Sequence, residues 1–139
     1  MSLISVTRLR VRSWRFLPGF LVQALRSARQ ARRTRGNLGT SLLAEAHRTF
    51  WTLTAWSDEA SMRSFMLDGV HRKGMPQLMT WCDEAAVVHW SRDDPALPTW
   101  AEAHRRLQAE GRHSKVTHPS AAHREYRIPP PVIRGRSRS

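Results

Sequence analysis

The chain has 139 residues, enough for one hydrophobic core and too few for two. Hydrophobic residues make up 40% of it and six residues are Trp, which excludes a wholly disordered protein. The 23 basic residues outnumber the 11 acidic ones and give a net charge of +12. This imbalance indicates an anionic partner, a self-association surface, or both.

The basic excess lies at the two ends of the chain. Residues 1–36 contain nine Arg and no acid, residues 37–91 contain four bases and six acids, and residues 92–139 contain ten bases and five acids. The single cysteine, Cys82, excludes an intrachain disulfide and a cysteine-based metal cluster. No membrane span or signal peptide is recognisable, so we expect a cytoplasmic protein.

The first third of the chain predicts a strand followed by a helix. Residues 3–11 alternate in side-chain type and are rich in β-branched residues, which is typical of a strand. In residues 18–35 the apolar side chains recur at helical spacing. Pro18 stands at the start of this segment and Gly36 follows its end, as expected at the two termini of a helix.

Two strands and a helix are predicted next. Residues 38–46 and 48–56 are separated only by His47, so they form an antiparallel hairpin with this residue at its turn. The run Ser57-Asp58-Glu59 then supplies an N-terminal cap and first-turn acids for a helix that ends near Gly69.

A helix, a strand and a final helix are predicted in the rest of the domain. Residues 71–82 are helical, with a proline tolerated near the start, and residues 84–90 alternate as a strand. A capping box that begins at Thr99 opens a helix to about Glu110. We therefore predict a folded domain over residues 1–111. The tail, residues 112–139, is rich in Pro and Arg and is expected to be extended or disordered.

This order of elements is the split βαβ of a ferredoxin-like α+β fold, with one antiparallel sheet and helices on one face. The strand at residues 48–56 carries Phe50 and Trp56 on one side and Trp51 and Leu53 on the other. Because both faces of this strand are bulky, we expect both to be covered. A second copy of the chain would cover the second face, which predicts a homodimeric α/β barrel.

The central segment carries a family resemblance. Thr54 to Phe65 has the pattern T-x-W-x-D-E-A-x-x-x-x-F, and a G-x-H motif follows at residues 69–71. This segment resembles spheroidene monooxygenase and the small proteins related to it. It also resembles the antibiotic biosynthesis monooxygenases of the dimeric α/β barrel superfamily. The resemblance covers residues 3–91 and implies an oxygenase-like enzyme. Barrel relatives include haem enzymes and cofactor-free oxygenases, so it leaves the reaction open.

The resemblance implies haem as a possible cofactor, with His71 as the ligand of its iron. A neutral imidazole at a helix start could take this role, and His89 would be the reserve ligand. Arg48 could pair with a propionate of the haem. The alternatives are a helix-capping or surface His71, a core His89, and an Arg48 that is solvated at the end of its strand.

Several large side chains could wall a pocket for a flat apolar small molecule. We predict that the pocket-lining residues are Phe50, Trp51, Trp56, Phe65, Met75, His89 and Trp90. The alternative is that they form an ordinary core. The histidines of the last third are His104, His113, His118 and His123, and their spacing is too irregular for a zinc site.

Two classes of function follow from these patterns. The first is an oxygenase-like enzyme that acts on an apolar small molecule in the barrel cavity, with haem or without a cofactor. The alternative is a basic non-enzymatic protein that binds nucleic acid or an anionic membrane through the Arg-rich helix and tail. The first is favoured, because no aromatic residue lies among the arginines between Arg26 and Arg35.

Overall fold

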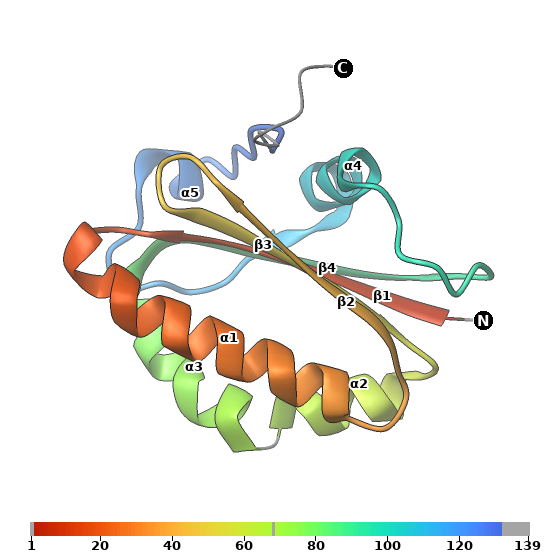
Figure 1. Cartoon of the computed structure of the whole chain (residues 1–139). Coiled ribbons are helices and arrows are strands. Elements are labelled where there is room, and N and C mark those ends of the chain that lie inside the picture. Colours follow the sequence, from red (N-terminus) through yellow and green to blue (C-terminus); the bar gives the residue numbers. More distant parts are fainter. Residues whose placement is uncertain (1, 68, 132–139) are drawn as a thin grey trace.

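A single antiparallel sheet organises the molecule. The structure, a computed structural model, describes residues 2–67 and 69–131, and only the backbone of residues 69–72. The strands are β1 (Ser2–Val11), β2 (Asn37–Glu45), β3 (Thr49–Trp56), β4 (Cys82–Arg92) and β5 (Arg112–His113). Their order across the sheet is β2-β3-β1-β4-β5, and all neighbours are antiparallel (Figure 1). This is the strand order of the split βαβ unit, so the predicted ferredoxin-like α+β fold is confirmed.

Three helices cover one face of the sheet (Figure 1). They are α1 (Leu17–Arg33), which follows a short 3₁₀ helix η1 (Trp14–Phe16), α2 (Glu59–Leu67) and α3 (Gly69–Trp81). The cap predicted within Ser57-Asp58-Glu59 is confirmed, and Asp58 provides it, because its carboxylate accepts the Ser61 N–H at 2.7 Å. Within the described residues, no helix is long and apolar enough to cross a bilayer.

One detail of α3 differs from the expectation. Pro76 lies inside the helix, not near its start. A proline there removes one backbone hydrogen bond. Its helix nevertheless continues, because Leu78 packs with Phe20 of α1 and Cys82 of β4 in a shared cluster. Tertiary packing therefore outweighs the local cost of the proline.

The opposite face of the sheet is covered by the chain's own C-terminal third (Figure 1). α4 (Trp100–Glu110) begins at the predicted cap, where the Thr99 hydroxyl accepts the Glu102 N–H. The apolar cluster beneath it is formed by Ile4, Val6, Trp51, Leu53, Val88, Trp90, Ala103, Leu107 and Ile128. The expected reason for a homodimer was an uncovered apolar face, and that reason does not apply. The dimer itself stays a prediction.

Residues 112–131 pack against the sheet, so this part of the tail is not disordered, and the prediction of an extended or disordered tail did not include this packing. β5 pairs with β4, and a short helix, α5 (Ala121–Arg124), lies on the same side of the sheet as α4 (Figure 1). Val116 and Ile128 are each only 8% exposed. Isolated apolar residues without periodicity gave no signal of this packing. Residues 132–139 lie outside the described residues.

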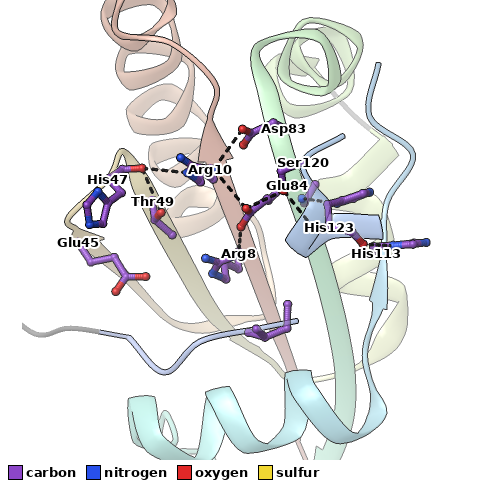
Figure 2. A network of polar contacts seen from close by, with 12 residues as sticks. Arg8, Arg10, Glu45, His47, Thr49, Asp83, Glu84, His113, Ser120 and His123 are labelled. Atoms are coloured by element: carbon purple, nitrogen blue, oxygen red, sulfur yellow. Dashed lines mark hydrogen bonds and ion pairs between the residues drawn. The ribbon is translucent and has the colours of Figure 1, made fainter. Parts of the chain in front are cut away.

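A buried ion pair anchors this C-terminal segment to the sheet (Figure 2). The Arg8 Nη1 donates to Glu84 Oε1 at 2.7 Å, and the Ser120 hydroxyl donates to Glu84 Oε2 at 2.8 Å. Burial raises the pKa of Glu84, but the hydrogen bonds from Arg8 and Ser120 and the charges of Arg8 and Arg10 outweigh it. The net effect is a lowered pKa. Glu84 is therefore ionised and holds the loop before α5.

A second anchor is His123, whose Nδ1 accepts the Ala85 N–H at 3.3 Å. Its ring stacks on His113 with 4.5 Å between centroids. Burial and the neighbouring His113 lower the pKa of His123 below 6.5, so the folded protein favours the neutral ring. Its stabilising effect is therefore complete above pH 6.5 and is lost as the pH falls from there through the folded-state pKa.

We expect the urea midpoint of unfolding to decrease as the pH is lowered from 7 to 5. His123→Asn keeps an acceptor near the position of Nδ1 and does not titrate, so its midpoint should decrease less over the same interval. Equal decreases in the two proteins would contradict this role of His123.

Candidate ligand cavity

A cavity of about 420 Å³ lies between the sheet and the three helices α1, α2 and α3. Strands β1, β3 and β4 form its floor, with Ser5, Thr7, Leu9, Phe50, Thr52, Thr54, Trp56, Val87 and His89. The helices form its roof, with Phe20, Ala24, Ala28, Ala31, Met62, Phe65, Met75, Leu78 and Met79. The cavity is thus a space within one chain, on the helical side of the sheet.

Polar groups of the floor occupy two neighbouring rows across the sheet. Ser5 lies opposite Thr54 on one side and opposite His89 on the other. The next row places Thr7 opposite Thr52. A ligand lying on the floor therefore meets hydroxyl groups and one imidazole at its centre, while the surrounding side chains are mostly apolar.

Aromatic pairs stand at the two ends of the floor. At one end, Phe20 of α1 contacts Phe50 with 4.8 Å between ring centroids. At the other end, Trp56 stacks on Phe65 at 5.5 Å, and its indole N–H donates to the Thr54 hydroxyl at 2.9 Å. Phe50 and Trp56 are six residues apart on one strand, roughly 20 Å at the usual rise. This elongated space suits a flat apolar molecule.

Small residues on α1 leave this space open. Ala28 and Ala31 are buried and Ala24 is half-buried, and all three face the strands across the cavity. A helix with leucines at these positions would fill the interior, as protein cores normally do. The sequence shows these alanines at helical spacing, but a tight helix–sheet contact would give the same pattern.

His89 is the imidazole of this cavity. The ring is half-buried, and burial is the main cause that lowers its pKa below 6.5. The positive charge of Arg112, another lining residue, lowers it further, and Glu59 opposes this effect. His89 is therefore neutral at pH 7 and is able to accept a proton.

Cys82 has no comparable reactivity. It is fully buried at the start of β4, away from the cavity lining. Burial, with a smaller contribution from Asp83, raises the pKa of its thiol to about 12. It behaves as a small apolar side chain, as the sequence indicated.

Six of the seven predicted pocket residues line the cavity, namely Phe50, Trp51, Trp56, Phe65, Met75 and His89. Trp51 lines it only in part, because its indole packs with Trp100 of α4 and donates to Glu45 at 2.9 Å. Trp90 is not a lining residue. It belongs to the cluster under α4, where the Arg106 guanidinium lies 5.2 Å from its ring centroid.

Of the two predicted cofactor-binding residues, Arg48 is not brought together with this lining. Arg48 donates from Nε to the Val11 carbonyl at 2.9 Å, and its guanidinium lies over the Trp14 ring. His71 lies in the first turn of α3, and its side chain is outside the described part of the chain. Among the described residues, no group of three or more His, Cys, Asp or Glu could hold a metal ion.

Sequence reasoning missed two features of the cavity, namely the hydroxyl groups on its floor and Arg112 as a lining residue. Ser5 and Thr7 alternate with buried Ile4 and Val6 along β1, which is the one signal that could have indicated a polar floor. The position of Arg112 depends on the pairing of β5 with β4, and its two residues have no strand pattern of their own.

Solved structures support the fold. SnoaB, a cofactor-independent oxygenase from Streptomyces nogalater, is 17% identical with a TM-score of 0.58, covering 70% of this chain and 98% of that chain. An antibiotic biosynthesis monooxygenase is 13% identical with a TM-score of 0.59, covering 66% and 99%. Rv0793 from Mycobacterium tuberculosis is 11% identical with a TM-score of 0.61, covering 69% and 99%. At these identities the likeness shows a common fold, the one that the resemblance predicted.

No curated protein matches the chain. Residues 14–122, which run from η1 through the helices and β4 to α5, match the sequence model of a family described as a domain of unknown function, DUF3291. The match spans most of the chain, and the protein therefore belongs to the DUF3291 family.

Proposed function

We propose that the protein is an oxygenase that binds a flat apolar small molecule in the cavity and removes a proton from it with His89. The observation that carries the proposal is the neutral imidazole of His89 on the floor of the cavity, beside hydroxyl groups and beneath a mostly apolar roof. The shared fold with SnoaB, which is named a cofactor-independent oxygenase, supports the same reaction class.

The chemistry requires a substrate with an acidic CH₂ group and dioxygen as the oxidant. Neutral His89 takes one proton, and the resulting carbanion transfers one electron to dioxygen. Combination of the two radicals forms a C–O bond and gives a peroxide, which receives the proton back from His89. Loss of water breaks the O–O bond and leaves a carbonyl, so that R₂CH₂ and O₂ become R₂C=O and H₂O.

The remaining residues of the cavity would bind and orient the substrate. The hydroxyls of Ser5 and Thr54 lie in the same row as His89 and could hold a phenol or carbonyl oxygen of the substrate. Phe50 and Trp56 would enclose the two ends of a polycyclic ring system. The apolar roof keeps water from the carbanion, which would otherwise be reprotonated.

The test uses anthrone, a three-ring ketone whose CH₂ group is acidic because its anion is aromatic. Oxygen uptake and quinone formation are followed with and without the protein. We expect one O₂ consumed per quinone formed, at a rate proportional to the protein concentration. A rate equal to that of the buffer alone, for anthrone and for other polycyclic compounds with acidic CH₂ groups, would contradict the proposal.

Filling the cavity should block the reaction without harming the fold. Ala28→Leu places about three extra carbon atoms in the cavity from the buried side of α1. We expect anthrone turnover to fall at least tenfold while the midpoint of thermal unfolding stays the same or rises. Ala109→Leu, on the exposed side of α4, is the matched control and should leave turnover unchanged. A similar loss in both variants would show that the cavity is not the site.

The haem-dependent version of this function remains a separate proposal, with His71 as the iron ligand. Arg48 does not reach the cavity, so Arg112 is the described lining residue that could pair with a carboxylate there. Titration of the protein with haem tests this version. A Soret band that is lost or shifted in His71→Ala would support it, and haem that does not bind would exclude it.

A further inference from the structure

The cavity opens beside exposed aliphatic side chains of α1. Leu21 and Leu25 line the cavity, and they are also 38% and 61% exposed. Val22, on the same side of the helix, is 56% exposed. Leu42 of the edge strand β2 and Met66 of α2 are further lining residues that reach the surface. The entrance is therefore an apolar surface, which is unusual for a protein surface that meets only water.

A basic surface continues along the same helix. Arg26, Arg29, Arg32 and Arg33 are exposed, and they follow Val22 and Leu25 at helical spacing. Among the described residues, none of these four guanidinium groups forms a salt bridge. The first 44 residues contain no Asp or Glu, so the positive charge of these arginines is not balanced by carboxylates nearby in the sequence.

Trp14 lies in η1, immediately before the N-terminal end of α1. Its side chain is 68% exposed, with the Arg48 guanidinium 5.4 Å from its ring centroid. Exposed Trp beside Arg is typical of the boundary between lipid headgroups and acyl chains, where the ring is partly apolar and its N–H still finds a polar partner.

We propose that α1 docks the protein onto an anionic lipid bilayer. Leu21, Val22 and Leu25 enter the apolar region, and the arginines of the second half of the helix contact lipid phosphates. In this orientation the cavity entrance faces the bilayer, from which an apolar molecule could enter without crossing water. Only this last consequence rests on the proposed oxygenase function, because the docking itself follows from the surface of α1.

Two other partners fit this surface less well. Nucleic acid would use the arginines, but the exposed aliphatic side chains gain nothing from phosphates, and no aromatic side chain for base stacking lies among the arginines of α1. A second copy of the chain would bring two arginine-rich helices together without acids on either, and this repulsion opposes association.

Cosedimentation with vesicles tests the proposal. The probes are vesicles of phosphatidylcholine alone and of an equal mixture of phosphatidylcholine and phosphatidylglycerol. We expect binding to the mixed vesicles, weak binding to the neutral ones, and weaker binding at high salt. Arg29→Gln should reduce the affinity for mixed vesicles about fivefold. Arg105→Gln, on the exposed side of α4, is the matched control and should change it little.

The aliphatic contribution is tested at Leu25. Leu25→Gln should reduce the affinity about tenfold, whereas Leu25→Met, which stays apolar and favours a helix, should keep it. Absence of binding to mixed vesicles, or equal binding by the two Leu25 variants, would overturn the proposal. So would tight binding to duplex DNA that Leu25→Gln leaves intact, or a dimer that this variant dissociates. None of these measurements depends on anthrone turnover, so failure of docking and failure of the oxygenase function are distinguishable.

Discussion

Replacing His89 with Gln is expected to lower anthrone turnover about 100- to 10,000-fold, the usual contribution of a general base. Gln has a similar size and polarity, but its amide does not accept a proton at neutral pH. Because His89 is only half-buried on a central part of β4, the fold should tolerate the change. The effect should therefore appear in kcat, with a much smaller change in KM.

The matched control for His89 is another histidine outside the cavity. His104 lies on α4, on the other side of the sheet, and its Nε2 is 2.6 Å from the Ile128 carbonyl oxygen. His104→Gln keeps a donor at this position and should leave turnover unchanged. Full activity of His89→Gln would show that the proton is taken by another group or that the reaction is of another class.

Replacing Glu84 with Gln is expected to lower the free energy of unfolding by about 3 to 5 kcal/mol, because removing one partner leaves a buried charge uncompensated. The side chains of Arg8 and Glu84 are 5% and 8% exposed. The variant keeps the size of Glu84 and a hydrogen-bond acceptor for Ser120, so the loss reports mainly the missing charge. Urea unfolding monitored by Trp fluorescence measures it.

Two control variants show whether the loss of stability is specific to the buried pair of Arg8 and Glu84. The ion pair between Glu59 and Arg63 is about two-thirds exposed at both side chains, so Glu59→Gln should cost less than about 0.5 kcal/mol. Arg8→Met combined with Glu84→Leu removes both charges and should recover much of the stability. A cost for Glu84→Gln that matches that of Glu59→Gln would show that the pair does not anchor the C-terminal segment.

The elements with local signals could be predicted from the sequence. Thr99 and Asp58 cap helices because short polar side chains can accept an N–H of the first turn. The turn at His47 was also predictable, since it separates two alternating segments; His47 and Arg48 take positive φ there. The strand order could be predicted from the order of elements, because only a few sheet topologies are compatible with short connections that do not cross.

The cover of the second sheet face could not be predicted in this way. Val116, His123 and Ile128 are buried in the C-terminal segment, but each is surrounded in sequence by polar residues, Pro or Ala. The segment that carries them is bonded to the sheet through Ser120 and Glu84, which are distant in sequence. The same limit applies to the cavity. The faces of Phe50 and Trp51 were predicted correctly, but which of the two faces encloses a space depends on the alanines of α1.

The pH dependence of kcat/KM for anthrone, measured in the wild type and in Arg112→Gln and His89→Gln, tests the central claim most directly. The wild-type rate should fall as the pH drops below a pKa that lies under 6.5, because protonated His89 accepts no proton. Arg112→Gln removes a nearby positive charge and should move this pKa upward, while His89→Gln should show no such ionisation. The same profile in all three proteins would contradict the assignment of His89 as the proton acceptor of this cavity.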